Sequence, residues 1–178
     1  MEFKFKDVFT GTQSALRSSP EKAVATFSAH SRLGDGVDSS VSTRQFTIKV
    51  DEPAGLGGTD TAPNPVEYIL AALGSCQEIT YRLYADALGI PVRSVSVKLE
   101  GEIDLRGLFN VDASIRPGFR NIFGTVTIDS TASEVEIQRL KDTVDQHCPV
   151  LDILKNPVPV SLELHQNLAA ASLSDARI

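Results

Sequence analysis

The chain has 178 residues, 42% of them hydrophobic, and a formal net charge of −6. This length suits one domain with a hydrophobic core, so we expect a single domain over residues 1–178. The acidic balance argues against binding to nucleic acid or to an anionic membrane through bulk charge. No apolar run is long enough to span a bilayer, and residues 1–20 lack the apolar core of a signal peptide, so we expect a cytoplasmic protein.

The N-terminal part of the chain predicts a short helix followed by a hairpin. Residues 5–18 have a weakly helical pattern that Pro20 ends, and we interpret them as part of an N-terminal extension. Alternating side chains then predict a strand over residues 22–33. The sequence Gly34-Asp35-Gly36 predicts a turn, and a return strand follows at about residues 37–51.

A glycine-rich stretch from Gly57 to Cys76 leads into the central predicted helix, with the sequence GGTDTAPNPVEYILAALGSC. Asn64-Pro65 suits the N-cap and first helical positions. We expect the helix to run to about Leu88, with Gly89 as its C-terminal stop. Because residues 69–73 are apolar on nearly all sides, this helix is expected to be central and buried.

The C-terminal half predicts strands around a second helix. Alternation of apolar and polar side chains is typical of a half-buried antiparallel strand. Thr131-Ala-Ser-Glu134 has the spacing of a capping box, and the helix that it starts carries an apolar stripe toward Cys148. We expect the small, polar tail to be disordered. The expected elements are a strand at 92–103, a loop at 104–120, a strand at 122–129, a helix from 131 to Cys148, a strand at 158–164 and the tail at 166–178.

The chain has two cysteines, Cys76 and Cys148, each on the apolar side of a predicted helix. They are 148 − 76 = 72 residues apart, so only tertiary packing can bring them to the Cα distance of about 4.4–6.8 Å that a disulfide needs. One interpretation is a thiol redox centre, and the other is a pair of small core residues; the pattern leaves both open. No C-x-x-C or H-x-x-x-H pair accompanies them, so we expect no metal site.

A peroxide-reducing centre would need a thiolate, a second thiol to trap the sulfenic acid, and a pocket for the peroxide. Cys76 lies in the middle of its predicted helix, so an arginine has to stabilise its thiolate. Arg44 and Arg32 are the candidates, because both precede the helix on predicted strands. The period of two places Arg44 on the face of Phe46, where a buried guanidinium needs a partner.

The stretch FTIKVDEPAGLGGTDTAPNPVEYILAALGSC, followed much later by HCPVLDIL and a final strand, resembles the OsmC/Ohr family. These are the osmotically induced protein C and organic hydroperoxide resistance proteins, and the resemblance, which is to the OsmC-like branch, covers roughly Ala23 to Leu164. It implies an α+β fold with antiparallel sheets from both halves of the chain around two long central helices. It also implies an intertwined homodimer, with an active site near each subunit interface.

The implied activity is thiol-dependent reduction of organic hydroperoxides in oxidative-stress defence. Cys76 matches the family's peroxidatic cysteine and Cys148 its resolving cysteine. The resemblance implies no metal, flavin or haem, and regeneration by an external dithiol such as a lipoylated protein or a small thiol. The alternative is a catalytically weak or inactive homodimer that binds an apolar small molecule at its interface.

The chain departs from the family pattern at one supporting residue. The family motif has a glutamate directly after Asn-Pro, to pair with the activating arginine. Here Val66 holds that place and Glu67 follows it, which rotates the carboxylate by about 100° around the helix. We therefore favour a role for Glu67 in the first helical turn over a role in catalysis.

Overall fold

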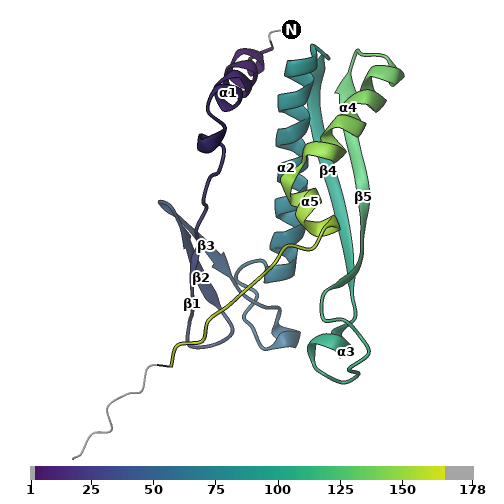
Figure 1. The fold of residues 1–178 in the computed structure, drawn as a ribbon. Helices are drawn as coiled ribbons and strands as arrows, with labels where there is room; N and C mark the ends of the chain where they lie inside the picture. The colour runs from purple at the N-terminus through teal and green to yellow at the C-terminus, as the bar shows by residue number, and fades with distance from the viewer. Residues whose placement is uncertain (1–2, 167–178) are drawn as a thin grey trace, which may run out of the picture.

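The computed structural model describes residues 3–166 of the chain, and it confirms the expected α+β class (Figure 1). The described residues form two antiparallel sheets, β1-β2-β3 and β4-β5, together with five α-helices. The elements in order are α1 Lys6–Ser18, η1 Pro20–Lys22, β1 His30–Leu33, β2 Ser39–Thr43, β3 Phe46–Val50, η2 Ala54–Leu56, α2 Pro65–Leu88, β4 Val92–Ile103, α3 Leu105–Leu108, β5 Phe119–Ser130, α4 Glu134–His147 and α5 Pro149–Lys155.

The body of the molecule is the long helix α2 with the β4–β5 hairpin and the helices α4 and α5 packed around it. Its core is completely buried at Tyr81 and Ala85 of α2 and at Leu140 and Val144 of α4. Leu140 and Val144 are four residues apart, so they lie on one stripe of α4, as the sequence predicts. Burying each such aliphatic side chain stabilises the fold by about 1.5–3 kcal/mol, which fixes α4 against α2.

The ends of α2 follow the sequence prediction. The Asn64 side chain accepts a hydrogen bond from the Glu67 backbone N–H at 2.9 Å, and the Glu67 carboxylate accepts one from the Asn64 N–H at 2.8 Å. This capping box satisfies two of the helix's orphan donors, and Pro65 occupies the first helical position. Gly89 ends the helix in the left-handed conformation, with φ of 69°.

The β4–β5 hairpin supplies the second wall of the core. The predicted strand at 92–103 coincides with β4, and β5 pairs with it in an antiparallel register, for example Val95 with Ile128 and Val97 with Val126. The polar side chains that alternate with these are exposed. The hairpin therefore has one apolar face against α2, as expected of a half-buried antiparallel pair.

The N-terminal helix α1 rests on the C-terminal part of α2. The ring of Phe9 meets the ring of Tyr84 edge to face, with 5.1 Å between centroids. The Phe5 backbone N–H donates to the buried carboxylate of Asp86 at 3.0 Å. These contacts hold one end of an arm that then runs in an extended course to the small sheet β1–β3, away from the body (Figure 1).

The predicted hairpin is present, but the strands around it are shorter than expected. The predicted strand at 22–33 is regular only in β1, because residues 23–29 have no partner strand in the described chain and their side chains are exposed. The return strand at 37–51 is divided into β2 and β3 by a tight turn, since Thr43 pairs with Phe46. Arg44 lies in that turn, with φ of 51°, a conformation that two-residue hairpin turns require. It therefore does not share the inward face of a strand with Phe46; its guanidinium lies 5.1 Å from the centre of the Phe46 ring instead.

Three expectations for the C-terminal half are also corrected. The capping box that begins α4 is Ser133 with Glu136, two residues later than predicted, because Ser133 also has a glutamate three positions on. The predicted loop at 104–120 contains the short helix α3.

The segment 158–164 is not a strand, because it pairs with no edge in the described chain: Leu162 and Leu164 are 91% and 96% exposed. Most of the predicted disordered tail lies outside the described residues.

A buried carboxylate organises the glycine-rich loop between β3 and α2. Asp51 is 1% exposed, and its carboxylate accepts hydrogen bonds from the backbone N–H of Glu52 and from the N–H and O–H groups of both Thr59 and Thr61. These donors, the Thr61 N–H first among them, hold the pKa of Asp51 well below its usual range. The side chain thereby ties the loop to the end of β3 and sets where α2 begins.

We expect Asp51→Asn to lower the thermal midpoint by several degrees at pH 7, because an amide cannot accept all five of these hydrogen bonds. Since folding depresses the pKa of Asp51, its contribution is fully present above the unfolded value of about 3.9 and is lost as pH falls through the lower folded value. The difference between wild type and variant should therefore shrink on acidification. Asp60→Asn, at an exposed loop position with φ of 57°, is the matched control; equal midpoints for wild type and Asp51→Asn at pH 7 would contradict this role.

Candidate functional site

The two cysteines meet in the structure. The Sγ atoms of Cys76 and Cys148 lie 3.3 Å apart, with the Cys148 thiol donating toward the Cys76 sulfur, and both cysteines are free. A disulfide has an S–S distance of about 2.05 Å, so bond formation requires the two atoms to approach by only about 3.3 − 2.05 ≈ 1.3 Å. The tertiary packing that the sequence separation demands is therefore present.

Each cysteine is held by helical structure. Cys76 lies in the middle of α2, where its carbonyl accepts from the Thr80 hydroxyl at 2.7 Å. Cys148 lies one turn beyond Val144, and its N–H donates to the Val144 carbonyl at 2.9 Å. Its own carbonyl accepts from the N–H of Asp152 at 3.0 Å, so Cys148 ends α4 and precedes α5. Pro149, at the first position of α5, lacks an N–H and suits this junction.

The environments of the two sulfurs differ. Cys148 is completely buried, whereas Cys76 is partly exposed. Burial raises the pKa of the Cys148 thiol, and the N–H of Leu151 and the side chain of Gln77 act in the opposite direction. Contact with Cys76 raises the pKa of Cys148 further. Cys148 is therefore held as a thiol, and Cys76 is the sulfur that a solute can reach.

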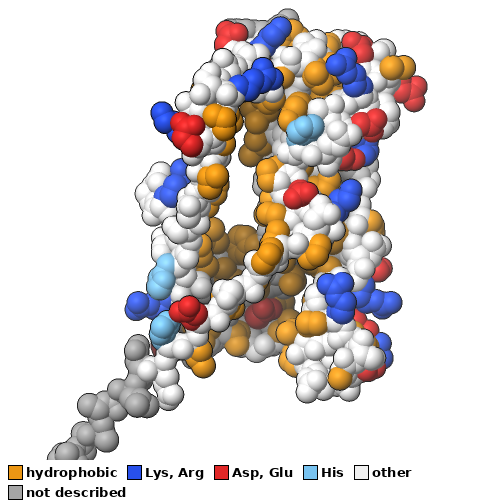
Figure 2. Space-filling model, viewed as in Figure 1, with side chains coloured by type: hydrophobic (Ala, Val, Ile, Leu, Met, Phe, Trp, Pro, Cys, Tyr) orange, Lys and Arg blue, Asp and Glu red, His pale blue; other side chains and the backbone are white. Residues whose placement is uncertain are grey.

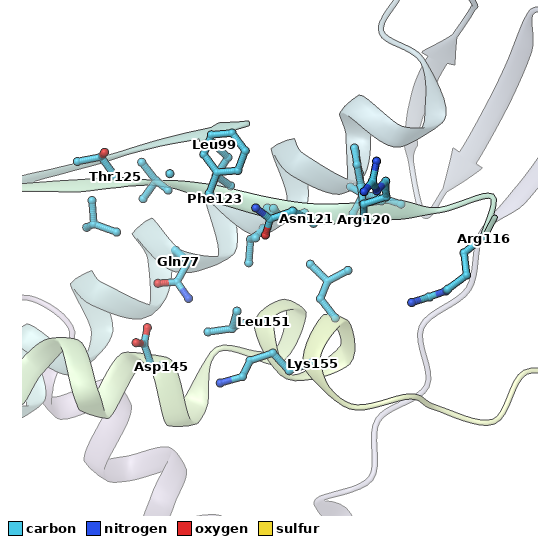
Figure 3. Close-up of a pocket in the computed structure, with 18 residues that line it drawn as sticks. Gln77, Leu99, Arg116, Arg120, Asn121, Phe123, Thr125, Asp145, Leu151 and Lys155 are labelled. Atoms are coloured by element: carbon cyan, nitrogen blue, oxygen red, sulfur yellow. The ribbon is translucent and has the colours of Figure 1, made fainter. Parts of the chain in front are cut away.

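A cavity of about 600 Å³ lies between α2, the β4–β5 hairpin and the α4–α5 junction, and its lining includes Gln77, the residue that follows Cys76 (Figure 3). Its walls are largely apolar, and Gln77 enters it from α2 on the side of Asp145 and Leu151. Basic side chains border it farther along, near the loop before β5 and on α5. The lining includes Ile69, Leu73, Gln77, Val97, Leu99, Arg116, Phe119, Arg120, Asp145, Leu151, Leu154 and Lys155.

The other predicted site residues are not brought to the sulfurs within one chain. Arg32 lies on β1 and Arg44 in the β2–β3 turn, both exposed on the small sheet that stands away from the body. Among residues 3–166, neither guanidinium makes an ion pair with a carboxylate or a hydrogen bond to Cys76. The Glu67 carboxylate is occupied in the capping box of α2, which agrees with the helix-turn role favoured from the sequence.

Gln77 is the neighbour of the sulfur pair that the sequence reasoning missed. Its side chain is 5% exposed although it is polar. Its position directly after Cys76 was visible in the sequence, but periodicity alone does not show that an amide at this position turns toward another helix. The available signal was an amide directly after Cys76 on a helix expected to be central and buried.

Two further properties bear on the kind of site. Within the described residues, no group of three or more His, Cys, Asp or Glu side chains is placed to hold a metal ion. None of the helices in that part of the chain combines the length and the apolar character that crossing a membrane requires.

Comparison with protein families identifies the class. The model of the family described as OsmC-like protein matches residues 58–163, which include α2, the β4–β5 hairpin and both cysteines. The chain belongs to the OsmC-like family, as its resemblance to OsmC/Ohr proteins predicts. A comparison with curated proteins finds no match.

Solved structures share the fold. The OsmC-like protein of Mycoplasma pneumoniae matches with a TM-score of 0.66 and 23% identity, over 75% of this chain and 89% of that one. An organic hydroperoxide resistance protein OsmC from Legionella pneumophila matches with a TM-score of 0.58 and 23% identity, over 75% and 92%. OhrB of Bacillus subtilis, an organic hydroperoxide resistance protein, matches with a TM-score of 0.50 and 18% identity, over 79% and 98%. At these identities, the likeness establishes the architecture.

Proposed function

We propose that this protein is a thiol-dependent peroxidase that reduces organic hydroperoxides, with Cys76 as the attacking cysteine and Cys148 as the resolving one. The observation that carries the proposal is the 3.3 Å contact between a partly exposed sulfur and a buried one. The names of structural neighbours support the same chemistry, because those from Legionella pneumophila, Elizabethkingia anophelis and Bacillus subtilis are organic hydroperoxide resistance proteins.

The reaction has two steps on the protein. The Cys76 thiolate attacks the terminal oxygen of the hydroperoxide, the O–O bond breaks, and the alcohol leaves with a proton while Cys76 becomes a sulfenic acid. The Cys148 sulfur then attacks the Cys76 sulfur, an S–S bond forms, the S–O bond breaks, and water leaves with the Cys148 proton. An external dithiol, such as a lipoylated protein or a small thiol, reduces the disulfide and restores both thiols.

The surroundings of the pair suit this division of roles. A raised pKa keeps Cys148 protonated, and a thiol is a poor nucleophile compared with a thiolate. Its S–H group is directed at the Cys76 sulfur, where a hydrogen bond stabilises negative charge. Cys76 is therefore the sulfur that is prepared for attack, and Cys148 is already in place for the second step.

The cation that would complete the site is proposed to come from the small sheet, with Arg44 and Arg32 as the candidates. Within one chain that sheet meets α2 near the start of the helix, where the Tyr68 hydroxyl donates to the Lys49 carbonyl of β3. Farther along α2, Figure 2 shows an opening between the N-terminal part of the chain and the body, with hydrophobic side chains at its edges. A second copy of the chain in an intertwined homodimer would fill this opening. The sheet of one copy could then lie against the α2 helix of the other, close to Cys76.

The exposed face of α2 supports the homodimer. Ala72, Ser75 and Ile79 lie on one face at helical spacing beside Cys76, and Ile79 is 61% exposed. Of residues 69–73, which the sequence predicts to be buried, only Leu73 is buried within one chain. The exposed apolar side chains of residues 158–164 add to this unpaired surface, and surface of this kind marks interaction sites. A partner chain would bury both the exposed face of α2 and the apolar side chains of residues 158–164.

A second candidate function rests on the position of Glu67. Its carboxylate is used in the cap of α2, and Val66 offers none, so no carboxylate follows Asn64-Pro65 directly to position an arginine. A homodimer that binds an apolar small molecule in the cavity, without reducing peroxide, is compatible with this arrangement.

A measurement of peroxide consumption distinguishes the peroxidase from the ligand-binding homodimer. With cumene hydroperoxide and a dithiol, wild type is expected to turn over, and Cys76→Ser to fall to the uncatalysed background, because it lacks the attacking sulfur. Cys148→Ser should consume about one equivalent and then slow markedly, since its sulfenic acid is not trapped within the chain. Peroxide that persists with wild type, together with binding of an apolar fluorophore that survives Cys76→Ser, would establish the second candidate instead.

Sedimentation equilibrium tests the assembly. We expect twice the chain mass of 19.2 kDa for wild type, and a shift to monomer for Ile79→Glu, because a carboxylate on this face of α2 would be buried without a partner. Val135→Glu, at a 79% exposed position of α4, is the matched control and should remain dimeric. A monomeric wild type at micromolar concentration would contradict the dimer.

A further inference from the structure

Gln77 is a buried amide beside the sulfur pair that the two-cysteine reaction leaves unused. It follows Cys76 in α2, and its side chain is 5% exposed. Figure 3 shows it directed from α2 into the cavity, toward the part of the α4–α5 region where Asp145 and Leu151 lie. Its side chain opposes the rise in the pKa of Cys148 that burial causes, and it lines the cavity together with Leu151, three residues after Cys148. A polar group buried at this cost is expected to have a defined partner.

The second step of the reaction requires negative charge on a buried sulfur. Cys148 has to lose its proton as it attacks, yet it is completely buried, so water cannot stabilise the charge. Two groups of the chain oppose the effect of burial on Cys148: the backbone N–H of Leu151 and the side chain of Gln77. Of these, only Gln77 is a side chain, and it comes from the helix that carries the other sulfur.

We propose that Gln77 is a positioning residue for disulfide formation: its amide N–H donates a hydrogen bond to the Cys148 sulfur as charge develops there during the attack on oxidised Cys76. This rests on the proposed function. The step is the one already balanced: the S–S bond forms, the S–O bond of the Cys76 sulfenic acid breaks, and the Cys148 proton leaves with the hydroxyl group as water. The hydroperoxide is the oxidant, and Gln77 is neither oxidised nor reduced.

This role gives Gln77 a kinetic signature. Loss of its donor should slow trapping of the sulfenic acid and leave the first step unchanged, because attack on the peroxide takes place at Cys76. A sulfenic acid that waits longer meets a second peroxide more often and is oxidised to sulfinic acid. A residue that only fills space would instead affect both steps, or neither.

Replacing Gln77 by methionine leaves the charged surroundings of Cys148 as they are in wild type. The titratable group in contact with it is Cys76 from α2. Four charged side chains border the cavity: Asp145 of α4, Lys155 of α5, Arg116 in the loop before β5, and Arg120 at the start of β5. Because Gln77→Met retains these groups, a difference between wild type and this variant reports the amide.

The test follows one equivalent of cumene hydroperoxide by rapid quenching, with dimedone to trap sulfenic acid and mass spectrometry to count disulfide and sulfinic acid. For Gln77→Met, which keeps the length of the side chain but has no donor, we expect sulfenic acid to form at the wild-type rate. Disulfide formation should slow about tenfold or more, as expected for the loss of a hydrogen bond to a charged group. Gln77→Glu should be slower still, because a carboxylate repels the thiolate. Gln138→Met, on the exposed face of α4, is the matched control.

A second measurement separates this proposal from the proposed function. In the Cys76→Ser background, the Cys148 thiolate is titrated by its ultraviolet absorbance, with no peroxide present. Adding Gln77→Met should move the midpoint to higher pH, because the thiolate loses a donor. If wild type forms no sulfenic acid, the proposed function fails while this titration still tests Gln77. An unchanged midpoint, or disulfide formation at the wild-type rate in Gln77→Met, overturns the role of Gln77.

Discussion

The packing of α4 against α2 is the constraint on which the site depends. Leu140 and Val144 are completely buried against the face of α2 that carries Tyr81 and Ala85. Four residues further along the same stripe, Cys148 ends α4, and its Sγ atom lies 3.3 Å from that of Cys76. The helical repeat that builds the core therefore also sets the distance between the two thiols.

The junction between α4 and α5 holds Cys148 in position against Cys76. Because Cys148 ends α4 and precedes α5, with Pro149 as the first residue of α5, its backbone is held from both sides. Its thiol is buried, directed at Cys76, and accompanied by the Gln77 amide. One chain thus contains what the proposed trapping step needs. The cation that the proposed attack needs is not beside Cys76 within the described chain, and a site completed by a second copy is the arrangement that the exposed face of α2 supports.

Periodicity in the sequence predicted those elements that form the core with neighbours in the same chain. α2 with its caps, β4 and the apolar stripe of α4 follow from local pattern, because each buries its face against a neighbour in the same chain. The juxtaposition of Cys76 and Cys148 was one of two open interpretations, since separation along the chain does not specify how two helices pack.

The expectations that were wrong share a physical cause. Residues 22–29 and 158–164 alternate as strands do, but a strand needs an edge to pair with, and the described chain offers them none. Arg44 was misplaced because the alternation continues through Thr43 and Phe46, where a turn rather than a strand joins them. The start of α4 was displaced because two residues satisfy the same capping spacing. Gln77 carries no periodic signal, and its role depends on what a different helix places opposite it.

The most direct test asks whether the two sulfurs join within one chain. A mixture of unlabelled and ¹⁵N-labelled protein, refolded together so that assemblies are mixed, is treated with one equivalent of cumene hydroperoxide, alkylated, digested and analysed by mass spectrometry. The packing of α4 on α2 predicts a cross-linked pair of peptides containing Cys76 and Cys148, with both peptides labelled or both unlabelled. Cross-links that join labelled to unlabelled peptides, or two cysteines that remain free for alkylation, would contradict it.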